Sequence, residues 1–278
     1  MSRWIRSSTL CALLGLGLCL GTSPAKADIN ISTSPGLPAG GTADPIYTAA
    51  FYTNTAILGI PGPVFPTGFV DGAPAPGPGG LPTSAGPAPG AVLVGFTPVV
   101  VPNGGFPIPP WVSDTTSSSW IAPTATGGST SALAPYLATG FSAATSAPQG
   151  YFYYNTSFTL ASATGNSLTG GLWATDNNGI AIYLNGNAEG SFVPGSTGFI
   201  SFSSFLINPN DFVKGANNLT FVVFNENFPP ATNHESPTGL NVEGAITSVP
   251  EPSTLAIAGL GALGMIGYGL RRRKALGA

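Results

Sequence analysis

The feature that most limits the fold of this chain is the lack of helical periodicity between its two ends. Between residues 28 and 247 no stretch keeps apolar residues at the three-to-four spacing of an amphipathic helix. The clearest pattern, in Tyr151–Leu160, instead has a period of two: apolar residues from Phe152 onward alternate with polar ones. Such alternation is typical of a strand with one buried face.

Shorter apolar runs separated by Gly, Asn and Pro extend this pattern along the chain. We expect further strands at 29–31, 48–60, 91–101, 168–175, 180–184, 199–207, 219–224 and 240–246. Within 180–184, the spacing places Ile180, Ile182 and Leu184 on one face. Asn185-Gly186 then favours a tight hairpin, because both residues tolerate positive φ. Asn208 is expected to cap one helical turn.

These elements predict an all-β fold with a single β-sandwich domain over residues 28–247. About 220 residues are enough to bury a substantial core. Residues 61–90 are rich in Pro and Gly and form an insertion that cannot bury enough apolar surface to order itself.

The charge balance of residues 28–247 limits the partners of this domain. Lys214 is its one basic residue, against ten acidic residues, which gives a formal charge of −9. Phosphate binding needs clustered Lys and Arg, so nucleic acid is not an expected partner. Both cysteines, Cys11 and Cys19, precede residue 28, so no disulfide is expected in the domain.

The first 27 residues have the pattern of a secretory signal peptide. Arg3 and Arg6 precede an apolar run over 10–20, and Ala25-Lys26-Ala27 matches the small-residue cleavage pattern at Ala25 and Ala27. We therefore expect a signal helix that signal peptidase removes, and an exported protein.

The last thirty residues contain three units in a fixed order. A proline-containing motif comes first, a stretch of sixteen uncharged residues (255–270) follows, and a basic cluster ends it. The motif is Val249, Pro250, Glu251, Pro252 and Ser253, and the basic cluster is Arg271, Arg272, Arg273 and Lys274.

The uncharged stretch predicts a C-terminal transmembrane helix that the basic cluster orients in the inner membrane. At 1.5 Å per residue it reaches only about 24 Å, which is less than the ~30 Å hydrocarbon core. Its five glycines also weaken a helix. A short helix weakened by glycine suits a segment that stays in the membrane only briefly before it is cleaved.

This order of parts resembles the PEP-CTERM sorting signal over residues 248–278. The same tail is also known as the C-terminal domain of ice-binding proteins, a name that says nothing reliable about activity. The resemblance implies an exported bacterial protein that passes through an inner-membrane intermediate. It also implies an exosortase, an integral-membrane cysteine protease, as the processing partner. A plain membrane-anchored sandwich protein is the alternative.

A second resemblance covers residues 120–246. Several elements in this order are similar to the galactose-binding-like jelly-roll. They are a tryptophan strand, Asp176-Asn177-Asn178-Gly179, a strand ending in Leu184-Asn185-Gly186, the segment 212–223 and a late strand at 237–243. That resemblance implies a two-sheet sandwich with a ligand site on loops at one end, and it implies no catalysis.

Two sets of residues are candidates for ligand binding. For sugar stacking and hydrogen bonding they are Trp120, Tyr151, Tyr153 and Asn233, with core packing as the alternative role of the aromatic rings. For a structural calcium ion, the one cofactor considered, they are Asp176, Asn177 and Asn178, joined by Asp44 or Glu243. Asp-Asn-Asn-Gly is also good turn chemistry without any ion.

The sequence offers little support for catalysis, and we expect no enzyme activity. His234-Glu235-Ser236 are adjacent in sequence and have no nucleophile-elbow motif. A glycan hydrolase remains the competing class, because Glu226, Glu235 and Glu243 are available, although their spacing singles out no pair. We therefore expect a structural or adhesive protein of the cell surface or extracellular matrix, either one that contacts exopolysaccharide weakly or a purely passive matrix protein.

Overall fold

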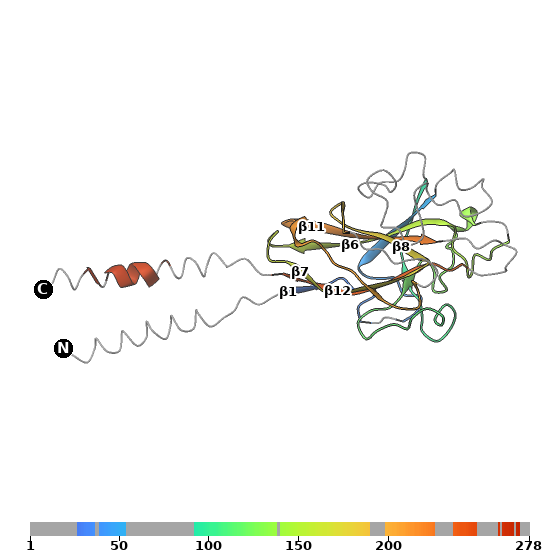
Figure 1. Ribbon diagram of the computed structural model, residues 1–278, viewed down its shortest axis with the longest axis horizontal. Coiled ribbons are helices and arrows are strands. Elements are labelled where there is room, and N and C mark those ends of the chain that lie inside the picture. The colour runs from blue at the N-terminus through green and yellow to red at the C-terminus, as the bar shows by residue number, and fades with distance from the viewer. Residues whose placement is uncertain are drawn as a thin grey trace. The chain divides into compact units, whose positions relative to one another are not determined.

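The computed structural model describes residues 27–36, 39–53, 92–137, 140–189, 198–225 and 236–248, and residues 261, 263–269 and 271–272 of the tail. The stretch Asp28–Thr247 forms one compact unit. Its strands assemble into two antiparallel sheets, A and B, which pack face to face (Figure 1). The predicted all-β sandwich is therefore confirmed for the described part of the chain.

Sheet B holds the long strand pairs of the domain. Its order is β3-β2-β6-β11-β8-β9. The strands are β2 (Tyr47–Thr53), β3 (Val92–Phe96), β6 (Gly150–Leu160), β8 (Asn178–Leu184), β9 (Asn187–Ala188) and β11 (Gly215–Asn225). Strands β6 and β11 pair along their whole lengths, from Gly215 opposite Leu160 to Asn225 opposite Gly150. The two-residue alternation of β6 predicted this strand correctly.

Sheet A is built around the last strand of the domain. Its order is β10-β7-β12-β5-β4, and β1 also pairs with β12. The strands are β1 (Ala27–Asn30), β4 (Val99–Val100), β5 (Ile121–Ala122), β7 (Ser167–Asp176), β10 (Ser203–Ser204) and β12 (Gly239–Ser248). Among the residues that the structure describes, the single-turn 3₁₀ helices η1 (Ala134–Tyr136) and η3 (Pro209–Asp211) lie between strands, and Asn208 caps η3 as predicted.

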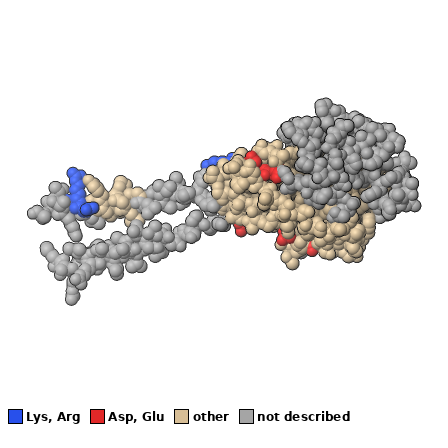
Figure 2. Space-filling model, viewed as in Figure 1, with Lys and Arg blue, Asp and Glu red and all other residues tan. Residues whose placement is uncertain are grey.

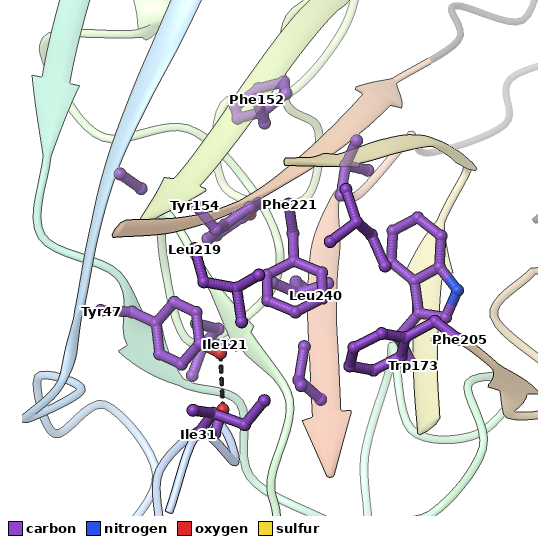
Figure 3. Close-up of a cluster of buried hydrophobic side chains, with 14 of the residues drawn as sticks. Ile31, Tyr47, Ile121, Phe152, Tyr154, Trp173, Phe205, Leu219, Phe221 and Leu240 are labelled. Carbon is purple, nitrogen blue, oxygen red and sulfur yellow. Dashed lines mark hydrogen bonds between the residues drawn. The ribbon is translucent and has the colours of Figure 1, made fainter. Parts of the chain in front are cut away.

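The facing sides of the two sheets share one hydrophobic core (Figure 3). The ring of Phe221 on β11 lies 5.9 Å from that of Trp173 on β7 and 5.5 Å from that of Phe205. The hydroxyl of Tyr47 donates a hydrogen bond to the carbonyl of Ile31 at 2.6 Å. Burial of each such large side chain contributes about 1.5–3 kcal/mol, so this core is the main source of stability.

Three strand predictions need correction. The strand expected at 91–101 is divided at Thr97-Pro98, so that β3 joins sheet B and β4 joins sheet A. Of the strand expected at 199–207, only the two residues of β10 (Ser203–Ser204) form a strand. Ile180 does not share a face with Ile182, because the register between β8 and β11 shifts at Val222 and makes Ile180 the extra residue of a β-bulge.

The tail is described only in part. Backbone in helical conformation occurs at residues 261, 263–269 and 271–272, the last two being Arg271 and Arg272. Among the residues that the structure describes, no helix is long and apolar enough to cross a membrane. The predicted transmembrane helix is therefore not supported, and its sixteen-residue stretch is shorter than the roughly 20 residues that a span requires.

Several predictions lie outside the described residues. They are the signal peptide up to Lys26, the insertion at 61–90, Asn233 to Glu235, the motif Val249–Ser253, and Arg273 and Lys274. The signal-peptide cleavage site and the domain boundaries remain predictions.

Candidate functional site

The outer face of sheet B, opposite the shared core, is the candidate functional surface. The side chains of β2, β6, β8 and β11 that point away from the core form a second cluster of their own. We name its aromatic members the tyrosine cluster: Tyr52, Tyr151, Tyr153, Tyr183 and Phe224. Strand pairing brings them together, since Tyr151 lies opposite both Tyr52 on β2 and Phe224 on β11.

The rings of the tyrosine cluster are in direct contact. Tyr52 and Tyr153 meet edge to face with ring centroids 4.5 Å apart, and Tyr151 and Phe224 are 4.9 Å apart. Tyr153 and Phe224 are each 3% exposed, whereas Tyr52 and Tyr151 are half-buried. The two half-buried rings are therefore the members that remain accessible to a ligand.

Polar side chains continue the same face beyond the tyrosine cluster. We name them the polar row: Thr48, Asn155, Ser157, Thr159 and Asn218. Asn155 is half-buried and the other four are exposed. The hydroxyl of Thr220 donates a hydrogen bond to Asn155 Oδ1 at 2.7 Å, which holds this amide in place between β6 and β11. The row offers hydroxyl and amide groups at the regular spacings of a sheet.

The whole face is electrically neutral among its described strand residues. Burial raises the pKa of the Tyr151 hydroxyl to about 12. Burial, followed by the neighbouring Tyr183, Tyr151 and Tyr52, raises the pKa of Tyr153 even further. These phenols therefore stay protonated under physiological conditions and keep their hydrogen-bond donors. Figure 2 shows that charged side chains are sparse on the described surface of the domain in that view.

The structure brings together two of the four predicted sugar-contacting residues. Tyr151 and Tyr153 lie side by side in the tyrosine cluster, as the alternation of β6 predicted. Sequence reasoning missed Tyr52 and Tyr183, because nothing local connects residues on β2 and β8 with β6. The period-two pattern did place Asn155 and Ser157 on the same face of β6 as Tyr153.

Trp120 is not part of this surface. Its ring is fully buried and packs on Trp111 with centroids 4.3 Å apart, on the other side of sheet A. Its indole nitrogen donates to the carbonyl of Val112 at 2.6 Å. The alternative role of Trp120, core packing, is the one that the structure shows, so we remove it from the candidate sugar contacts.

The predicted calcium ligands lie where the chain passes from sheet A to sheet B. Asp176, Asn177 and Asn178 are each 3% exposed or less, and Asp176 Oδ2 accepts a hydrogen bond from the indole of Trp111. The Asp44 carboxylate accepts four hydrogen bonds from residues 34–47. Within the described ranges, no three His, Cys, Asp or Glu side chains form a group that could hold a metal ion.

Comparison with known families finds a match at the tail. A PEP-CTERM protein-sorting motif matches residues 248–274, as the sequence predicted. Motifs of this kind mark exported proteins that are processed at the membrane, and an exosortase recognises them. No curated protein matches the chain.

Proposed function

We propose that this chain is an exported surface or matrix protein whose β-sandwich binds neutral polysaccharide through the outer face of sheet B. The observation that carries the proposal is the neutral face on which Tyr52 and Tyr151 adjoin the polar row. An exosortase processes the tail, and signal peptidase removes the first 27 residues.

The chemistry of the face supports an uncharged sugar polymer. Pyranose rings present C–H faces, which pack against aromatic rings, and rims of hydroxyl groups, which exchange hydrogen bonds with hydroxyls and amides. Tyr151 supplies the ring, and Asn155 and Ser157 on the same strand supply the polar contacts. The strongly negative domain would repel anionic polymers. The galactose-binding-like jelly-roll resemblance agrees with this ligand class.

We propose binding rather than hydrolysis. A glycosidase needs two carboxyl groups facing one cleft, and the described strand residues of this face carry none. Incubation with the polysaccharide that binds, followed by measurement of reducing ends, separates the two classes. Steady release of reducing ends would favour the hydrolase.

Affinity electrophoresis of the mature protein from its host tests the proposal. Gels containing a neutral glucan or mannan should retard the protein, and gels containing an anionic uronate polymer should not. Tyr151→Ala should weaken retardation roughly tenfold, which corresponds to a loss of about 1.4 kcal/mol.

Two threonine variants, one on each sheet, test whether the loss of any exposed hydroxyl group weakens the retardation. Thr159→Val removes a hydroxyl of the polar row, while Thr169→Val removes an exposed strand hydroxyl from sheet A. Weakened retardation in the first variant alone supports the outer face of sheet B as the binding surface. Equal behaviour of Tyr151→Ala and the wild type would refute it.

A further inference from the structure

We propose that the exosortase acts on an already folded sandwich, and that strand β12 sets the upstream limit of its cut at Ser248. This inference rests on the proposed processing of the tail, but it is independent of polysaccharide binding. It concerns the mature C-terminus and the rate at which that terminus forms.

Strand β12 is an interior strand of sheet A. On one side it pairs with β7 from Gly239 opposite Asp176 to Thr247 opposite Ser167. On its other side lie β1 and β5. Leu240, Val242 and Ile246 are fully buried in the shared core. The last strand before the tail is therefore required for both the sheet and the core.

Residues at the start of the domain form hydrogen bonds with β12 on the side opposite β7. The amide of Ile31 donates to the carbonyl of Gly244 at 3.0 Å, and that of Thr33 to Val242 at 2.9 Å. Thr33 Oγ1 also accepts from the amide of Val242 at 3.0 Å. The hydroxyl of Thr247 donates to Asp28 Oδ1 at 2.9 Å. The two predicted processing sites thus border a pair of adjacent strands.

No spacer separates the folded domain from the sorting motif. Strand β12 runs to Ser248, and the matched motif begins at residue 248. Proteases act on backbone that is locally open, and an interior strand opens only with much of the fold. Once the sandwich has formed, peptide bonds within β12 are closed to the enzyme, and no residue of the chain separates the end of this strand from the motif.

A spacer insertion tests this inference in the native host. Six residues, Gly-Ser-Gly-Ser-Gly-Ser, are placed between Ser248 and Val249 of the full chain, and pulse–chase labelling follows the loss of the tail. We expect processing to become several-fold faster and the mature C-terminus to retain the spacer. The same six residues inserted between Asn185 and Gly186, at the β8–β9 turn, are the control and should leave the processing rate unchanged.

Mass spectrometry of the mature protein provides the second readout. In the wild type we expect every C-terminus at residue 248 or later. C-termini within residues 239–247, or equal rates with and without the spacer, would overturn the inference. A wild-type tail that stays intact whether or not the exosortase is present would instead refute the proposed processing itself.

Discussion

The indole N–H of Trp111 donates a hydrogen bond to Asp176 Oδ2 at 2.8 Å. This bond connects the segment before β5 with the point where the chain leaves sheet A for sheet B. Both residues are buried, and an added Cβ at Gly239 would lie 2.6 Å from the Trp111 ring. The tryptophan is therefore held by β12 as well as by the carboxylate.

Trp111→Phe should destabilise the protein by about 1–3 kcal/mol, because it removes a donor from a buried carboxylate. The measurement is the midpoint of chemical denaturation. Asp176→Asn keeps an acceptor for the indole and should cost less. An unfolding midpoint equal to that of the wild type for Trp111→Phe would show that the bond contributes nothing.

Gly179→Ala should destabilise the sandwich by about 1–3 kcal/mol through overpacking. A Cβ at this position would lie 2.5 Å from the Trp173 ring, which is itself fully buried. Gly95 on β3 is the matched strand glycine, since a Cβ there meets no atom within 4 Å. Thermal unfolding of Gly95→Ala should match the wild type, and similar losses in the two variants would contradict the packing argument.

Asp44→Ala should cost roughly 3 kcal/mol, because it leaves several buried donors without their acceptor. The carboxylate accepts from the amide and hydroxyl of Ser34 at 2.6 and 2.8 Å, and from the amides of Ile46 and Tyr47 at 2.8 and 2.6 Å. Denaturant titration measures the loss. Asp28→Ala removes an exposed carboxylate and should change stability by about 0.5 kcal/mol or less. Comparable losses in the two variants would disprove the role of Asp44.

Glu189 should make stability depend on pH. Partial burial raises the pKa of its carboxyl to about 7; the hydrogen bond from the Asn208 amide opposes this shift and the nearby Asp211 adds to it. Because the folded-state pKa exceeds the ordinary 4.5, the folded state binds the proton more tightly. The stability that this proton contributes is full below about pH 4.5 and is lost as the pH rises through about 7.

Glu189→Gln should therefore flatten the fall in melting temperature between pH 5 and pH 8. Glu243→Gln, which removes one carboxylate from β12, is the control, and its melting temperature should still fall between pH 5 and pH 8. An unchanged pH profile in Glu189→Gln would assign the dependence to other groups.

Local patterns predicted the elements whose causes lie within a few residues. The alternation in β6 placed Phe152 and Tyr154 in the shared core and Tyr153 on the outer face. Asn185 and Gly186 have φ of 53° and 84°, as a tight turn requires. Asn208 Oδ1 accepts from the amide of Asn210 at 3.1 Å, as the cap prediction implies. Turn and cap geometry depend on nearest neighbours, which the sequence displays directly.

The sequence by itself determined that this is an exported β protein with a sorting tail, because alternation, turn residues and the PEP-CTERM motif are local features. Only the tertiary structure decided which strands pair. The partners of Tyr151 come from residues 52 and 224, and the face of Ile180 depends on the β-bulge in β8 where it pairs with β11. Strand pairing depends on burial and hydrogen bonding between residues that are far apart in the sequence, so no short stretch of sequence predicts it.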